Sequence, residues 1–226
     1  MNLLSLIDPM SGLVVVGGTA LATLLRVGAS DCKVTWRVLR HLGSSEFDED
    51  HLRSDLARMV VDLQTDGIWR TEPYYFRDDA SRIAGEAMIK ARSLAVFYDK
   101  VAKAKAIRLA NARKAYKTLT LAAETAPAFG LAGTLLALSQ MPAEGNIGMG
   151  AVLAAAVLTT LYGVLLAHLM LTPLAEAIRR SSEREEEARD QHMRWTEAQL
   201  ENTVIRLPDE TGFDDSLLIN PDFVAA

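Results

Sequence analysis

Two titratable side chains other than tyrosine, Glu124 and His168, lie within or beside the last two long apolar stretches of this 226-residue chain. An ionisable group inside a membrane is a functional candidate, because a charge in hydrocarbon is costly. His168 could titrate near neutral pH and carry a proton, or it could make an interhelical hydrogen bond instead. Glu124 lies about a turn and a half from the edge of its stretch and could simply reach headgroup water.

The same stretches contain hydroxyl groups and prolines. The hydroxyl of Thr134 or Thr160 can donate and accept a hydrogen bond, and can therefore pass a proton between water and a carboxylate. The ordinary alternative is that each hydroxyl bonds the carbonyl four residues earlier in its own helix. Pro127 and Pro173 lack the amide proton, so we expect each to break the helical bonding and produce a kink.

No constellation typical of an enzyme is present in the sequence. There is no Ser/His/Asp arrangement and no phosphate-binding loop, and the single cysteine, Cys32, excludes an internal disulfide and a thiolate metal site. We therefore predict a protein that is not an enzyme and uses no metal or cofactor. The four histidines have no ligand spacing: His41, His51, His168 and His192.

The apolar residues, half of the chain, gather in three stretches that predict membrane-spanning helices. They run from about 9 to 25, from 119 to 141 and from 147 to 174. Small residues recur within them, as is typical of helices that pack closely in lipid. We expect packing roles for Gly17, Gly18, Gly130, Gly133 and Gly163.

Lys and Arg follow the first and third stretches and fill 100–117, whereas 1–25 and 142–148 have none. This asymmetry predicts a multi-pass protein with its N-terminus outside the cytoplasm and its C-terminus in the cytoplasm. The basic run beside a span favours anionic lipid headgroups over nucleic acid as its partner. The predicted organisation is 1–26, first span; 27–118, cytoplasmic helices; 119–174, a transmembrane hairpin; 175–207, a cytoplasmic helix; and 208–226, a disordered acidic tail.

Two helices are expected within the cytoplasmic region. Residues 51–63 place Leu52, Leu56, Met59, Val60 and Leu63 on one stripe at helical spacing. Residues 80–116 continue the helical period and are expected to run straight into the second span. Gly67 and Pro73 punctuate the segment between these helices.

Several of these segments resemble the MotA/TolQ/ExbB proton channel family. PAFGLAGTLLAL (127–138) resembles its second-to-last span, and LTTLYGVLLAHLMLTPLAEAI (158–178) resembles the last span of its MotA members. IDPMSGLVVVGGTALATLL (7–25) and DGIWRTEP (66–73) are more loosely similar to MotA segments. The resemblance implies an all-α membrane protein with three transmembrane helices and cytoplasmic helical extensions. It places this protein in the bacterial inner membrane, so that the N-terminus would be periplasmic and the C-terminus cytoplasmic. It also implies a pentameric ring around a central pore, which encloses two copies of a single-span partner with a protonatable aspartate.

The resemblance implies roles for individual residues. Thr134 and Thr160 match pore-facing threonines, and Pro127 and Pro173 match prolines that shape the cytoplasmic mouth. Glu72 matches a glutamate that contacts a cytoplasmic partner. There are departures: the chain has three predicted spans where MotA has four, Ala155 stands where ExbB and TolQ carry glutamate, and Gln64 stands where MotA has arginine.

The sequence therefore predicts a stator-type proton-channel subunit that couples ion-motive force to mechanical work through a single-span partner. The alternative is a non-conducting structural scaffold that keeps the family fold, which Ala155 and Gln64 favour because the pore acid and one rotor-facing charge are missing. Flagellar rotation, energy transfer to the outer membrane and other outputs stay open, as does the choice between proton and sodium.

Overall fold

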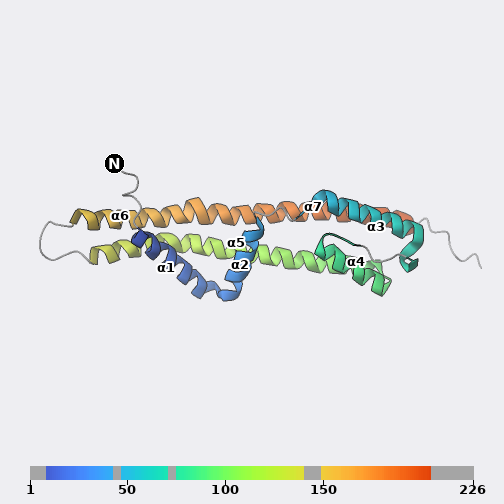
Figure 1. Ribbon diagram of the computed structural model, residues 1–226, viewed down its shortest axis with the longest axis horizontal. Coiled ribbons are helices and arrows are strands. Elements are labelled where there is room, and N and C mark those ends of the chain that lie inside the picture. Colours follow the sequence, from blue (N-terminus) through green and yellow to red (C-terminus); the bar gives the residue numbers. More distant parts are fainter. Residues whose placement is uncertain (1–8, 43–46, 71–74, 140–148, 205–226) are drawn as a thin grey trace, which may run out of the picture. The chain divides into compact units, whose positions relative to one another are not determined.

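The computed structural model describes residues 9–42, 47–70, 75–139 and 149–204, and every regular element in this part of the chain is a helix (Figure 1). The chain divides into two compact units. The first unit comprises Met1–Asp48 and Val101–Glu187, and the second comprises Glu49–Lys100 and Ala188–Ala226. The all-helical prediction is confirmed for the described residues.

Among the described residues, three helical stretches are long and apolar enough to cross a membrane, as predicted: Pro9–Val27, Leu94–Ser139 and Val152–Glu201. Their most apolar windows have mean hydropathies of 1.6, 1.4 and 2.0. Helix α1 (Pro9–Val27) starts at a proline, which suits the first helical turn because no intrahelical N–H hydrogen bond is lost there. Gly28, with φ of 90°, ends it.

In the first unit, α1 packs against α6 (Met149–Leu165). The buried side of α1 is a stripe at four-residue spacing: Ser11, Val15, Thr19 and Thr23. The hydroxyls of Thr19 and Thr23 donate to the carbonyls of Val15 and Thr19, each at 2.7 Å. This stripe carries small or β-branched side chains. The hydrogen-bonding capacity of the threonine hydroxyls as donors is satisfied within α1 itself.

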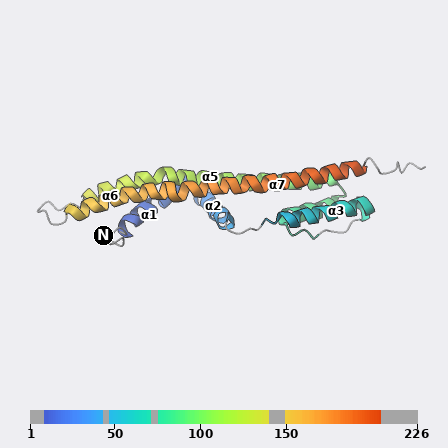
Figure 2. The same cartoon turned by 90° about the horizontal axis from the view of Figure 1, so that it is seen from above.

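Helix α5 (Leu94–Ser139) continues through Pro127. After the predicted hairpin loop, whose residues 142–148 lie outside the described ranges, α6 passes without interruption into a π-helical segment, η2 (Leu166–Leu171), and α7 (Thr172–Val204). In both views α5 and α6 lie side by side (Figures 1 and 2). Helix α2 (Ala29–Leu42) packs against α5 and α7 through a cluster around Ala115, Leu119, Ala175 and Ile178.

The second unit has its own apolar core. The predicted stripe on α3 (Glu49–Arg70) is confirmed, since Leu52, Leu56, Met59 and Val60 are buried there. Phe76 and Phe97 pack with ring centroids 6.5 Å apart. Gly67 has φ of 66°, which confirms a local break at this glycine. Pro73, Pro208 and the predicted acidic tail lie outside the described residues.

One helix prediction is wrong in detail. The expected helix over 80–116 is divided into α4 (Asp79–Ala91) and the start of α5, because Arg92 adopts a left-handed conformation with φ 50° and ψ 39°. The Arg92 guanidinium donates to the carbonyls of Ile68 and Trp69 at 2.8 and 2.9 Å. It also lies 5.9 Å from the ring centroid of Trp69. These contacts with α3 stabilise a backbone conformation that non-glycine residues seldom adopt.

Candidate functional site at the crossing of α5 and α6

The backbones of α5 and α6 meet at glycines. A Cβ atom added to Gly163 would lie 2.8 Å from the Ala126 carbonyl oxygen and 3.0 Å from the Gly130 Cα. One added to Gly130 would lie 3.0 Å from the Thr159 carbonyl oxygen. No side chain fits between these backbones, so dispersion contacts run directly from helix to helix.

The packing predicted for the glycines is therefore confirmed at the crossing. Gly133 is packed against the Thr159 side chain, since a Cβ atom added to this glycine would lie 3.0 Å from Thr159 Cβ. Gly18 of α1 is packed against the ring of Phe129 on α5. Gly17 differs, since a Cβ atom added there would meet no described atom within 4 Å apart from its chain neighbours and its own helix backbone.

The threonines at the crossing differ in burial. Thr159 is 3% exposed, whereas Thr134 and Thr160 keep an intermediate exposure. All three hydroxyls donate to carbonyls of their own helix, Thr134 to Leu131 at 2.7 Å, Thr159 to Ala156 at 2.9 Å and Thr160 to Ala156 at 3.4 Å. The longest of these bonds is therefore made by a hydroxyl that its own subunit does not bury.

Large apolar side chains around the two threonines are exposed. Leu131 and Leu135 on α5 are 58% and 69% exposed, and Val157 on α6 is 70% exposed. In a membrane such faces are covered by lipid or by other transmembrane helices. The crossing therefore presents partly accessible hydroxyls within an otherwise apolar surface.

The two candidate titratable groups, Glu124 on α5 and His168 in η2, are exposed side chains. Neither makes a hydrogen bond or ion pair with another residue in the described ranges. Within this part of the chain the fold therefore leaves both groups accessible and does not join them into a pair. Glu72, the predicted partner contact, lies outside the described residues.

The two prolines have different surroundings. The α5 backbone stays helical through Pro127, whereas the six residues of η2 come directly before the first turn of α7, which contains Pro173. The amide and the hydroxyl of Thr172 both donate to the Ala167 carbonyl, the hydroxyl at 2.9 Å. A wider turn relieves the crowding that a proline ring causes with the preceding helical turn. Sequence reasoning expected a break at Pro173 but missed this π-helical form, of which a Thr-Pro pair inside an apolar helix is the one available signal.

Sequence reasoning also missed two internal uses of the basic run. In the first unit, the Arg108 guanidinium makes a two-point contact with the Glu186 carboxylate, at 2.5 and 3.0 Å, and Glu186 is buried. Lys114 lies 3.3 Å from the Asp31 carboxylate of α2. These cations therefore connect helices within the unit, because each has an acidic partner far away in the sequence.

A further ion pair closes the second unit. Arg189 of α7 lies 2.9 Å from Asp78, whose carboxylate also accepts from the Ser81 amide at 2.9 Å and caps α4. Burial opposes ionisation of Asp78, but the hydrogen bond and charge of Arg189, together with the Ser81 hydrogen bonds, outweigh it and hold the pKa of this carboxyl below its ordinary value. The charged pair therefore stabilises this end of α4.

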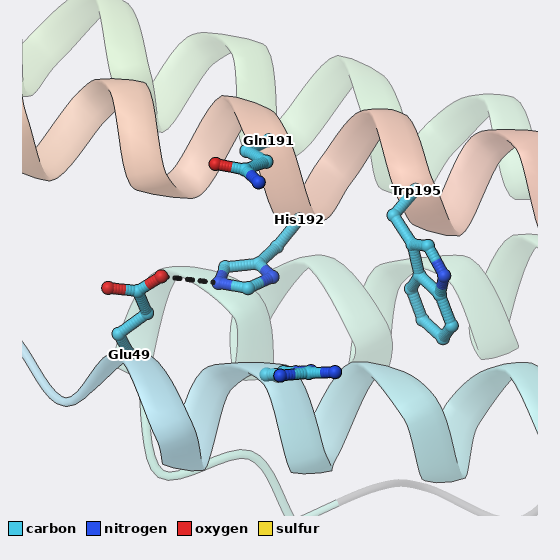
Figure 3. A pocket seen from close by; sticks show the side chains of 5 residues that line it. Glu49, Gln191, His192 and Trp195 are labelled. Atoms are coloured by element: carbon cyan, nitrogen blue, oxygen red, sulfur yellow. Dashed lines mark hydrogen bonds and ion pairs between the residues drawn. The ribbon is translucent and has the colours of Figure 1, made fainter.

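A shallow groove of about 260 Å³ lies in the second unit between α3 and α7. Figure 3 shows His192 of α7 turned toward Glu49 at the start of α3, with His192 Nε2 3.1 Å from the Glu49 carboxylate. Gln191 and Trp195 of α7 lie on either side of His192 along the groove. Arg53 completes the lining. In the described part of the chain, no group of three His, Cys, Asp or Glu side chains is placed to hold a metal ion.

Three apolar helices and a glycine-lined crossing define a polytopic α-helical membrane protein. Residues 79–191 match the MotA/TolQ/ExbB proton channel family. The chain is 30% identical over 195 residues to the uncharacterized protein YtxD of Bacillus subtilis, and the match covers 80% of this chain and 68% of that protein. It therefore belongs to the MotA/TolQ/ExbB proton channel family and is an inner-membrane protein.

Other similarities cover different extents of the chain. A segment of 54 residues is 44% identical to Motility protein A of Borreliella burgdorferi, but this match spans 23% of the chain and only 21% of that protein. The flagellar MotAB stator complex from Bacillus subtilis superposes with a TM-score of 0.71 at 16% identity, over 94% of this chain and 88% of that one. The C. jejuni MotAB structure gives 0.69 at 17% identity, over 90% and 86%. The chain thus has the fold of these structures.

Proposed function

We propose that this chain is the channel-forming, stator-type subunit of an ion-driven inner-membrane motor complex. Five copies would surround two copies of a single-span partner, and a protonatable aspartate of the partner would face Thr134 and Thr160. The single observation that carries the proposal is that these two hydroxyls stay partly accessible at the α5–α6 crossing, in a chain of a proton channel family.

Each of the two hydroxyls can make a hydrogen bond beyond the one to its own helix. A hydroxyl has one proton to donate and two lone pairs, so Thr160 can still accept a hydrogen bond while it donates to Ala156. A protonated aspartate can supply that hydrogen bond, and a water molecule can do the same. Exposed Leu135 and Val157 would meanwhile cover neighbouring helices of the ring and exclude bulk water.

The proposal includes an orientation and a division of labour. The N-terminus and the 142–148 segment would face the periplasm, and 27–118 and the C-terminal helix would lie in the cytoplasm. Residues 1–26 would form the outer span, 119–174 the pore hairpin and 175–207 the cytoplasmic helix. Pro127 and Pro173 would shape the cytoplasmic mouth, while Glu124 and His168 would be accessible to the ion near the spans. The protein would act without enzymatic chemistry.

Native mass measurement and ion uptake test the proposal together. The complex is extracted gently from its own membranes, weighed intact and reconstituted into liposomes that contain a pH-sensitive dye. We expect five copies of this chain with two of a small single-span protein. Thr134→Val or Thr160→Val should lower proton uptake by about two- to tenfold, because a hydrogen bond between uncharged groups contributes about 0.5–1.5 kcal/mol.

Thr159→Val is the matched control, since Thr159 also donates to Ala156 but is buried against Gly133. Uptake should be retained in this variant. A partner-free assembly, or equal uptake by wild type and both pore variants, would contradict the channel proposal.

A non-conducting membrane scaffold is the second candidate. It is favoured by Ala155, which leaves α6 without a carboxylate, and by the own-helix hydrogen bonds of Thr134 and Thr160. A stable ring that takes up no protons or sodium ions under an imposed gradient would support this candidate against the first.

A further inference from the structure

Helix α2 has two faces of opposite character. Val38, Leu39 and Leu42 are packed against the cluster formed by α5 and α7, and Thr35 is buried beside them. The opposite side exposes a stripe at three- and four-residue spacing, which we call the α2 outer face: Lys33, Trp36, Arg37 and Arg40. Trp36 is 70% exposed, which is unusual for so large an aromatic side chain in water.

The level of α2 along the spans follows from what it touches. Its apolar side meets Leu119, where the second predicted span begins, and Ala175, one residue after the third ends. The chain leaves α1 at Val27, turns at Gly28 and enters α2 directly, and α2 runs across the direction of α5 and α7 in the first unit (Figure 1). A helix transverse to spanning helices at their ends lies along the membrane surface.

The positive charge of the α2 outer face is not neutralised by the described protein. The acid of α2, Asp31, lies 3.3 Å from Lys114 of α5. In the described ranges, Lys33, Arg37 and Arg40 make no ion pair, unlike Arg108, which is held by Glu186. Three cations and a tryptophan therefore face outward at the level where the spans end.

We propose that the α2 outer face binds the headgroups of anionic phospholipids. Arg37 and Arg40 present planar donors that match phosphate oxygens, and Lys33 adds a third positive charge. The indole of Trp36 fits the boundary between headgroups and acyl chains, where one edge of the ring meets water and the other meets hydrocarbon. This surface holds α2, and through it the ends of α5 and α7, at a defined depth. The proposal rests on the membrane location of the chain and not on ion conduction.

Lipid titration of the intact, detergent-purified complex tests the charge requirement. The melting temperature and the bound lipids, counted by native mass spectrometry, are followed as phosphatidylglycerol or phosphatidylcholine is added. We expect the wild type to prefer phosphatidylglycerol. Each of Lys33→Gln, Arg37→Gln and Arg40→Gln should lower this preference about fivefold, because one cation near an anionic surface contributes about 1 kcal/mol, and the triple variant should show the three losses together. Lys33→Arg with Arg37→Lys and Arg40→Lys should retain it.

A charge-matched control removes three exposed cations of the second unit, in Arg58→Gln, Lys90→Gln and Arg194→Gln. This triple variant should keep the lipid preference of the wild type. An unchanged preference in the α2 triple variant, equal binding of the two lipids, or the same stabilisation by soluble glycerol phosphate would overturn the assignment to a lipid surface.

Fluorescence quenching tests the position of Trp36 independently. The chain has three tryptophans, so Trp36-only and Trp195-only variants are made by changing the other two to phenylalanine. In nanodiscs with about 30% phosphatidylglycerol, lipids brominated near the headgroup should quench Trp36 and leave Trp195 bright. Equal quenching of the two variants by brominated lipid would overturn the proposal. So would a Trp36 that brominated lipid leaves unquenched and whose fluorescence changes only on addition of another protein.

Discussion

Replacing Gly163 by alanine tests the backbone contact between α5 and α6. The new methyl carbon would lie 2.8 Å from the Ala126 carbonyl oxygen, closer than such atoms approach in proteins, and 3.0 Å from the Gly130 Cα, which is a tight contact. Both neighbours are backbone atoms, so the strain can be relieved only by moving the helices apart. Overpacking of this kind costs about 1–3 kcal/mol, and the better helix propensity of alanine offsets about 1 kcal/mol. We expect a net loss of up to about 2 kcal/mol in the free energy of unfolding.

The assay is unfolding in mixed micelles by titration with sodium dodecyl sulfate, followed by far-ultraviolet circular dichroism. Gly17→Ala is the control, because its new Cβ would meet no described atom within 4 Å apart from its chain neighbours and its own helix backbone. This variant should be as stable as wild type or slightly more stable. The double variant of Gly130→Ala and Gly163→Ala should lose less than the sum of the single losses, since one separation of the helices makes room for both methyl groups. A Gly163→Ala protein as stable as the Gly17→Ala control would refute the close crossing.

Three further predictions concern the ion pairs and a buried phenol. Glu186→Gln leaves Arg108 without its carboxylate and should lower the free energy of unfolding by about 2–3 kcal/mol, whereas the exposed neighbour Glu187→Gln should change it by less than about 0.5 kcal/mol. Equal losses of unfolding free energy for Glu186→Gln and Glu187→Gln in denaturation experiments would contradict the Arg108–Glu186 ion pair. Because the pKa of Asp78 is lowered in the folded protein, its contribution to stability is complete above the unfolded value of about 4 and is lost as pH falls below it. Asp78→Asn should remove the part of the loss of stability at low pH that protonation of Asp78 causes. An unchanged midpoint and slope of acid unfolding in this variant would contradict the prediction. The Tyr98 hydroxyl is buried without a hydrogen-bond partner in the described chain, and burial, followed by the charge of Glu197, raises its pKa to about 12. Stability is therefore lost as pH rises from about 10 toward the folded value, so Tyr98→Phe should remove that loss and gain up to about 1 kcal/mol at neutral pH, and a clearly less stable phenylalanine variant would contradict the buried, unpaired hydroxyl.

The spans could be predicted from sequence because their signal is local. The predicted first span, 9–25, differs from α1 only at its C-terminal end, which extends to Val27, since a run of apolar residues bounded by Pro9 and Arg26 is visible without any tertiary information. The α3 stripe has the same origin, as helical periodicity alone shows which side chains share a face. The glycine crossing could also be predicted from the sequence, because small residues within apolar membrane helices usually mark positions where helices pack closely.

The division at Arg92 could not be predicted, because its cause lies elsewhere in the chain. No glycine or proline lies in the segment from Lys90 to Leu94, and the left-handed residue is stabilised by carbonyls that α3 supplies 23 and 24 residues earlier. The ion pairs are similar: Arg108 and Glu186 are 78 residues apart, so the basic run gave no indication of which cations are used inside the protein. Tertiary contacts of this kind override local propensity.

The three threonines at the crossing differ in what they can contact outside this chain. Thr134, Thr159 and Thr160 each donate to a carbonyl of their own helix, so replacing any of them with valine removes no hydrogen bond between the described helices. Their difference is burial, and only Thr159 is enclosed by α5 and α6. A loss of ion flux at Thr134 and Thr160, with none at Thr159, must therefore arise from groups that the two accessible hydroxyls meet outside their own subunit. That pattern would distinguish a pore lined by hydroxyls from a scaffold in which threonine serves only its own helix.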